Sequence, residues 1–267
     1  MKRIMISIGN FLFKHRNSLF PLYILALFLI FRPPVSRIRG SESAENILDL
    51  AAVVIALAGL AIRGIVIGLA YIKRGGRNRK VYAANLVTEG MFSVCRNPLY
   101  VGNMLIFTGQ FLIFGNHWCL LIGVASFWFI YECIIAAEEN YLREKFGTAY
   151  DDYCYDVPRW MPKFSKLGES TTGMKFDWRK VILKDYPTMC STLIFLAGIQ
   201  LWEVLANYGF QQHQREVYSL SIAVIAISLI ALAIRTFKKS ARPAARESLE
   251  DGVVADAPSG LESIPRS

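Results

Sequence analysis

The chain has 267 residues, of which 54% are hydrophobic, and its mean hydropathy is +0.34. The apolar residues cluster in runs, which excludes an ordinary soluble domain and predicts a membrane protein with several spans. The net charge of +9 comes from lysines and arginines at the ends of these runs. It therefore indicates membrane topology, and we expect no nucleic acid as a partner.

Apolar segments that could span the membrane are expected wherever a helix has roughly 20 residues to cross about 30 Å of hydrocarbon. Six candidates follow one another along the chain: residues 17–31, 47–72, 99–114, 118–137, 188–210 and 217–234. The first, between Arg16 and Arg32, is short enough to be an interfacial anchor instead. The third and fourth are joined only by Gly115, Asn116 and His117, which predicts a helical hairpin.

Two features of these segments bear on assembly and orientation. Gly64 and Gly68 have the spacing that allows close helix packing, either within the chain or in a homo-oligomer. Lysine and arginine cluster before the first span and after the second, fourth and sixth. With six spans these clusters share one side, so the positive-inside rule predicts that both termini are cytoplasmic.

Polar motifs flank the third and fourth spans, and the hairpin brings them to one face. They read Arg96-Asn97-Pro98-Leu99-Tyr100-Val101-Gly102, Glu138-Glu139, Phe146-Gly147-x-x-Tyr150-x-x-Tyr153 and Val157-Pro158-Arg159. This order resembles the isoprenylcysteine carboxyl methyltransferase and phospholipid methyltransferase superfamily. The usual pattern there is Arg-His-Pro-x-Tyr-x-Gly, Glu-Glu, Phe-Gly-x-x-Tyr-x-x-Tyr and a Pro-Arg pair.

The resemblance implies a membrane-embedded enzyme that uses S-adenosylmethionine to methylate a lipid headgroup or an isoprenylcysteine-like carboxylate. It implies an all-α bundle of about six spans with a cytoplasmic cofactor-binding cap. Arg159 is implied at the reacting end. The implied cofactor-binding residues are Arg96, Asn97, Pro98, Leu99, Tyr100, Gly102, Glu138, Glu139, Tyr150 and Tyr153.

This reading divides the chain into four parts. Residues 1–46 form an N-terminal anchor and loop, and residues 47–167 form the membrane methyltransferase core. Residues 168–237 form a linker and an additional hairpin. Residues 238–267 contain few large apolar side chains and are predicted to be disordered.

The motif turn departs from the superfamily pattern at one position, because Asn97 stands where histidine is usual. Pro98 suits the first turn of a helix, since it lacks an N–H and fixes φ. The N–H groups exposed at that helix start could bind the carboxylate of the cofactor. Asparagine cannot become cationic, so a charge contact at this turn would be weakened or moved to Arg96.

Two ionisable residues lie deeper in the predicted spans. Arg63 is ten residues before Lys73, hence about 15 Å into the bilayer, and Glu132 is about 9 Å deeper than Glu138. Intramembrane charges are rare unless they face a cavity or each other. We expect both near the acceptor pocket, acting with Arg159 in catalysis; a structural Arg63–Glu132 pair is the alternative.

The acceptor and the protein class leave alternatives open. An anionic acceptor needs no base, whereas an amine must lose a proton, a task for a carboxylate such as Glu132. We favour an anionic or otherwise polar lipid headgroup. The other classes are an NADPH-binding membrane reductase of the steroid reductase type and a non-catalytic scaffold. The three histidines are isolated and the five cysteines lack paired spacing, so we expect no metal.

Overall fold

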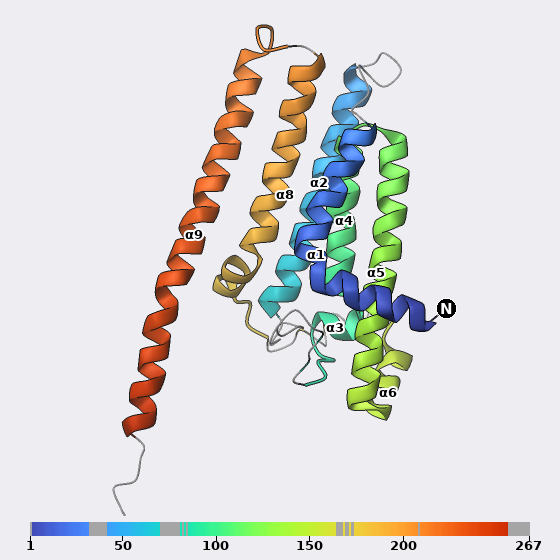
Figure 1. The fold of residues 1–267 in the computed structure, drawn as a ribbon, viewed down its shortest axis with the longest axis vertical. Coiled ribbons are helices and arrows are strands. Elements are labelled where there is room, and N and C mark those ends of the chain that lie inside the picture. The colour runs from blue at the N-terminus through green and yellow to red at the C-terminus, as the bar shows by residue number, and fades with distance from the viewer. Residues whose placement is uncertain are drawn as a thin grey trace, which may run out of the picture.

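The computed structural model describes residues 2–31, 42–69, 85–163, 174–207 and 209–255, and single residues at 81, 83, 168 and 171. Every regular element in these ranges is an α-helix (Figure 1). The helices are α1 (Lys2–Phe31), α2 (Glu42–Leu69), α3 (Met91–Val94), α4 (Pro98–Ile113), α5 (His117–Phe146), α6 (Thr148–Asp156), α8 (Trp178–Asn207) and α9 (Gln214–Ala255). The predicted all-α helical bundle is confirmed.

Four of these helices, α2, α5, α8 and α9, are long and apolar enough to cross a membrane. Helix α4 is apolar but has only 16 residues. The first predicted segment is the second half of α1, which is continuous from Lys2 to Phe31. Figure 1 shows that the beginning of α1 lies across the bundle, whereas the rest runs along it. This course fits an interfacial start better than a simple span.

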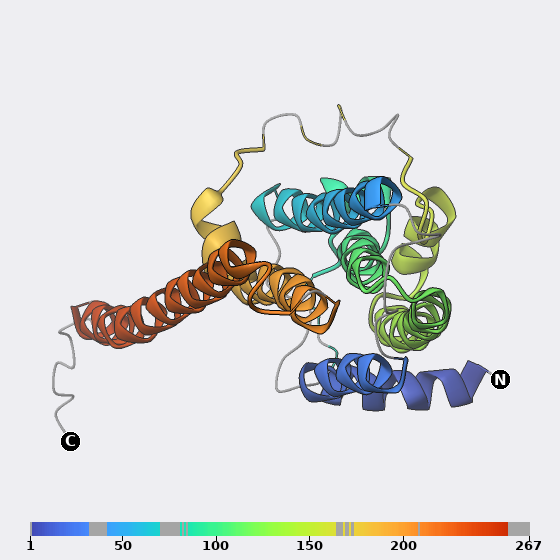
Figure 2. The same ribbon diagram turned by 90° about the horizontal axis from the view of Figure 1, so that it is seen from above.

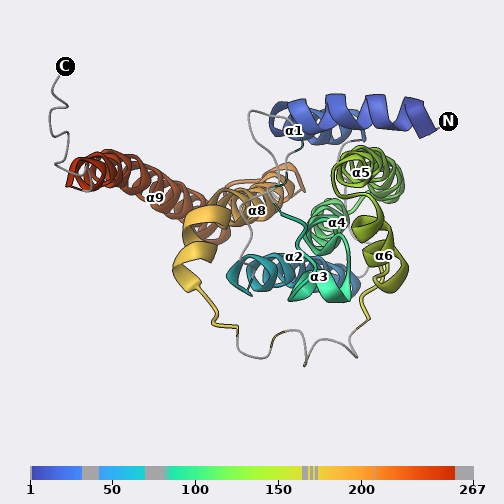
Figure 3. The same ribbon diagram turned by 90° about the horizontal axis from the view of Figure 1, so that it is seen from below.

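Helix α4 lies at the centre of the bundle, with α1, α2, α5 and α8 around it and α9 outside against α8 (Figures 2 and 3). Aromatic rings fill the middle of the bundle and its end opposite the motifs. The rings of Phe28 and Phe114 stack with centroids 4.0 Å apart, and those of Phe107 and Phe127 with centroids 4.1 Å apart. Phe111 and Phe127 are fully buried. Such packing stabilises the bundle and closes this end to polar ligands.

Close approach of α2 and α4 depends on glycines other than Gly64 and Gly68, the two that were predicted to allow close packing. A Cβ atom on Gly102 would lie 2.8 Å from the carbonyl oxygen of Gly59, and one on Gly109 would lie 2.8 Å from Cβ of Ala56. Gly64 makes only an ordinary contact with α8, and Gly68 lies under the ring of Phe176. The tight helix contact is therefore internal, and a homo-oligomer stays a prediction.

The C-terminal hairpin starts earlier and continues further than the sequence predicted. Helix α8 begins at Trp178 and not at residue 188, because Oδ1 of Asp177 accepts a bond from the amide N–H of Lys180 at 2.9 Å and caps the helix. Helix α9 runs to Ala255, beyond residue 234, where the last predicted span ends; disorder of the tail from residue 238 stays a prediction. Extending a formed helix needs no new nucleus, and alanine, arginine and glutamate favour it. The basic residues at 73–80 lie outside the described residues.

Candidate functional site

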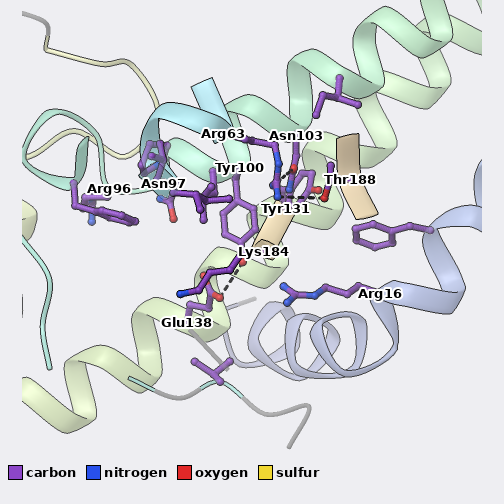
Figure 4. Close-up of a pocket in the computed structure, with 18 of the residues that line it drawn as sticks. Arg16, Arg63, Arg96, Asn97, Tyr100, Asn103, Tyr131, Glu138, Lys184 and Thr188 are labelled. Atoms are coloured by element: carbon purple, nitrogen blue, oxygen red, sulfur yellow. Dashed lines mark hydrogen bonds between the residues drawn. The ribbon is translucent and has the colours of Figure 1, made fainter. Parts of the chain in front are cut away.

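A cavity of about 860 Å³ opens at the end of the bundle where the motifs gather. Of the predicted cofactor-binding residues, all but Gly102 line it. Gly102 instead faces Arg63 and Gly59 in the contact between α2 and α4. Arg63 lines the cavity, whereas Glu132 and Arg159 are outside its lining. Figure 4 shows how the labelled side chains converge from several helices.

The motif turn begins α4 and is joined to the Pro158-Arg159 segment by hydrogen bonds to the backbone carbonyl oxygens of that segment. The amide N–H of Arg96 donates to the carbonyl oxygen of Pro158 at 2.9 Å. The Asn97 side chain does not cap α4; its Nδ2 donates to the carbonyl oxygen of Arg159 at 3.1 Å. Amides of Tyr100 and Val101 donate to the carbonyl oxygen of Asn97. Because these amides bond within the protein, the groups that the turn offers to a ligand are mainly side chains and not backbone donors.

The two neighbouring glutamates at the end of the membrane part of α5 have different partners. Glu138 accepts a hydrogen bond from the hydroxyl of Tyr100 at 2.9 Å. Glu139 accepts from Nη1 of Arg96 at 3.1 Å and from Nη2 of Arg159 at 2.6 Å. This division follows from the rotation of about 100° between adjacent helical residues. Arg143, one turn further along α5, pairs with Asp151 at 2.7 Å.

Arg159 connects Glu139 to Glu132. Its Nη1 lies 2.7 Å from Oε2 of Glu132, whose other oxygen accepts from Nε1 of Trp160 at 2.6 Å. The adjacent carboxylate of Glu139 raises the pKa of Arg159, so the guanidinium stays charged. Glu132 is therefore held beside the cavity, without lining it.

Arg63 and Asp185 form a buried ion pair in the bundle. They are 7% and 1% exposed, and Nε of Arg63 donates to Oδ2 of Asp185 at 3.1 Å. A second nitrogen, Nη2, contacts Oδ1 of the same carboxylate, which makes the pair bidentate. The guanidinium also donates to Asn103 at 2.5 Å and Thr188 at 3.3 Å. The alternative of an Arg63–Glu132 pair is therefore wrong.

Sequence reasoning missed Asp185 because the fifth predicted apolar segment began at residue 188, which left Asp185 in a loop. The cap at Asp177 was the signal that could have found it, since a helix from residue 178 places Asp185 two turns inside. Several other lining residues were missed, and most come from α1 and α8: Arg16, Phe20, Ile24, Asn103, Gln110, Tyr131, Lys180, Lys184, Thr188, Thr192 and Phe195.

Helix α6 packs its two motif tyrosines inward. Tyr150 is 2% exposed and Tyr153 is buried, and the hydroxyl of Tyr153 donates to the carbonyl oxygen of Phe92 at 2.7 Å. Burial raises the pKa of both phenols, so they stay neutral donors. The tyrosines thus fix α6 against the segment that precedes the motif turn, while their rings line the cavity.

Metal ligands were not expected from the sequence. Among the described residues, no three His, Cys, Asp or Glu side chains gather as a metal site would require. That the protein holds no metal stays a prediction.

The comparisons with known proteins concern mainly the segment that carries the motifs. Residues 47–149 match the model of the phospholipid methyltransferase family. Over 77 residues the chain is 34% identical to protein-S-isoprenylcysteine O-methyltransferase of Schizosaccharomyces pombe, covering 29% of this chain and 33% of that protein. It is 31% identical over 77 residues to protein-S-isoprenylcysteine O-methyltransferase B of Arabidopsis thaliana, covering 29% of this chain and 39% of that protein.

A longer alignment joins the chain to cobalt-zinc-cadmium resistance protein CzcN of Cupriavidus metallidurans. The two are 27% identical over 166 residues, 62% of this chain and 72% of that protein. The chain thus spans only about a third of the two isoprenylcysteine methyltransferases. No solved structure matches it significantly. The predicted resemblance to the isoprenylcysteine carboxyl methyltransferase and phospholipid methyltransferase superfamily is thus confirmed for residues 47–149.

Proposed function

We propose that this protein transfers a methyl group from S-adenosylmethionine to a lipid or lipidated acceptor in the membrane. The observation that carries the proposal is the cavity of about 860 Å³ at the motif end. It joins the superfamily motifs at the end of the bundle to an apolar interior between α1, α4 and α8. A polar cofactor and an apolar acceptor could therefore meet without leaving it.

The residues at the polar end fit the charges of S-adenosylmethionine. Glu138 and Glu139 suit its ammonium and sulfonium groups, and Arg96 suits its carboxylate. Nε of Arg96 is buried without a hydrogen-bond partner among the described residues, so one donor remains for a ligand. The rings of Tyr150 and Tyr153, which line the same end, suit the adenine face.

When bound, S-adenosylmethionine supplies a methyl group on a cationic sulfur: the C–S bond breaks as the acceptor's bond to the methyl carbon forms, and the sulfur becomes neutral. The protein mainly has to align the two reactants and exclude water. Arg159 holds Glu139 in place and stays cationic. Arg63, already neutralised by Asp185, orients Asn103 beside the cavity. We propose these as supports of the reacting geometry, not as proton carriers.

The acceptor is proposed to be anionic, with its headgroup near Arg16 and Lys184. Both line the cavity, and Figure 4 shows both of them near Glu138. An anionic oxygen needs no base before methylation. An amine acceptor would need one, and Glu132, the candidate base named from the sequence, is outside the cavity lining and already bonded to Arg159 and Trp160.

A cytoplasmic location of the site and of both termini is also proposed, and the positive-inside rule supports it. The N-terminus lies at the same end of the bundle as α3 and α6 (Figure 1). Basic residues gather at this end, among them Lys2, Arg3, Lys145, Lys163 and Arg179.

Calorimetry on the purified, detergent-solubilised full chain tests the cofactor. We expect S-adenosylmethionine to bind the wild type, and Glu138→Ala and Tyr100→Ala each to weaken binding about 10-fold or more, since each removes one partner of a buried hydrogen bond. Glu144→Ala, an exposed change on the same helix that leaves the cavity lining intact, should bind as the wild type does. Binding of NADPH in place of S-adenosylmethionine would contradict the proposal.

A further inference from the structure

Deep in the cavity, on α4, lies a polar side chain that the proposed methyl transfer does not use. Gln110 is only 5% exposed and lines the cavity. Its Oε1 has no hydrogen-bond partner among the residues that the structure describes. Leaving a buried amide oxygen without a donor costs free energy, so such groups are rare and call for a specific explanation. A ligand that brings its own donor is one.

The position of Gln110 relates it directly to the motif end. Tyr100, Asn103, Phe107 and Gln110 all line the cavity, and their spacing of three and four residues places them on one face of α4. Gln110 is ten residues beyond Tyr100, so it lies about 15 Å further along the helix. A ligand whose headgroup contacts the motif end must therefore be elongated to reach it.

Between Asn103 and Gln110, the side of the lining formed by α1 and α4 is apolar. Phe20 of α1 and Ile106 and Phe107 of α4 line it, and the rings of Phe20 and Phe107 have centroids 6.3 Å apart. At the level of Gln110, Thr192 of α8 is 2% exposed and also lines the cavity. The lining therefore changes from charged to apolar and back to polar.

The cavity ends shortly beyond Gln110. Phe195 lines it, and its ring packs against that of Phe28 at 5.3 Å between centroids. Phe28 in turn stacks on Phe114, and the intervening Phe111 is fully buried. These rings close the bundle, so a bound chain would stop just past Gln110.

We propose that Gln110 accepts a hydrogen bond from a hydroxyl or amide N–H carried on the apolar chain of the acceptor. The acceptor is then an elongated amphiphile with two polar groups: an anionic headgroup at the motif end and a hydrogen-bond donor about 15 Å away. This inference rests on the proposed function, because it assumes that the acceptor occupies the cavity with its headgroup toward Glu138.

Octadecanoic acid and a series of its monohydroxy derivatives, with the hydroxyl at successive positions, are suitable probes. Binding to the purified full chain is measured in detergent by competition and by the shift in thermal unfolding. The isomer whose hydroxyl lies about 15 Å from its carboxylate should bind about 3- to 10-fold more tightly than octadecanoic acid, which is the usual effect of one net hydrogen bond. Other isomers should show no advantage.

Gln110→Leu should abolish that preference and still bind octadecanoic acid. The matched control is Gln200→Leu, the same change on α8, where the side chain donates to Asp49 at 2.9 Å and is outside the cavity lining. It should keep the preference. Equal affinity for hydroxylated and plain acids in the wild type, or a preference that survives in Gln110→Leu, would overturn the inference.

Stability without ligand gives a second readout. Gln110→Leu removes an unpartnered polar group and keeps a similar volume, so it should unfold at the same or a higher temperature. A lower unfolding temperature would mean that a structural water satisfies Gln110, and would also overturn the inference. S-adenosylmethionine binding separates the two proposals: if it persists while the hydroxyl preference is absent, only this inference fails.

Discussion

The two ends of the cavity differ in how they are built. The motif end is assembled from residues between Arg96 and Arg159, which are bonded to one another through Glu139 and through backbone contacts. The deeper wall combines α4 with α1 and α8, which lie outside the segment that matches the phospholipid methyltransferase family. On the proposed function, the chemistry and the choice of acceptor reside in different parts of one chain. Cofactor binding should then depend on the first part and acceptor selection on the second.

The ion pair between Arg63 of α2 and Asp185 of α8 joins the segment that matches the phospholipid methyltransferase family to the part outside it, and breaking it should have the largest effect. Asp185→Asn leaves a guanidinium buried without its counter-charge, at a cost of about 3–5 kcal/mol in stability. We expect a markedly lower midpoint of thermal unfolding. Because α8 loses its anchor on α2, transfer to a lipid acceptor should fall more than the affinity for S-adenosylmethionine.

The control for this prediction is the double variant Arg63→Met with Asp185→Leu. It removes both charges and should recover most of the lost stability, since apolar replacements of a buried pair are often neutral. If Asp185→Asn unfolded at the temperature of the wild type, the pair would not be the link between the two parts.

The sequence predicted the two regions unequally, and for a physical reason. The motif end consists of residues close to helix boundaries, where proline at residue 98 and a helix pair with a three-residue connection limit the geometry. The nine motif residues that line the cavity could therefore be named in advance. The ion pairs of Arg159 and the functions of these residues could not be predicted from the sequence.

The deeper wall depends on long-range packing that no local pattern encodes. Arg63 was expected to face a cavity, and it does, but its partner came from a helix whose start was placed ten residues too late. Arg16 and Lys184 looked like ordinary topology signals at helix ends. A hydropathy window detects the apolar run of a span but not the polar turn that precedes it. In α8 the cap at Asp177, and not the apolar run, determines where the helix begins.

A smaller effect is expected from the cationic side chains that α1 and α8 contribute. Arg16→Gln and Lys184→Gln should each raise KM for an anionic lipid acceptor several-fold, because each removes one partly screened charge contact. The affinity for S-adenosylmethionine, measured by calorimetry, should change less than KM. Lys163→Gln, another basic residue at this end of the bundle but outside the cavity lining, is the control. An equal loss in all three variants would indicate general attraction to the membrane surface instead of a site.

The smallest effect should come from restoring the superfamily's histidine at the motif turn. Asn97 now donates to the carbonyl oxygen of Arg159 at 3.1 Å, and an imidazole in Asn97→His can keep that bond. Below its ordinary pKa of about 6.5 the histidine becomes cationic and can attract the cofactor's carboxylate. Affinity for S-adenosylmethionine in Asn97→His should then increase by up to a few-fold as the pH falls from 8 to 6, with no such change in the wild type. A pH-independent ratio between the two proteins would instead place the cofactor's carboxylate away from residue 97, near Arg96, and would separate the two halves of the motif turn by function.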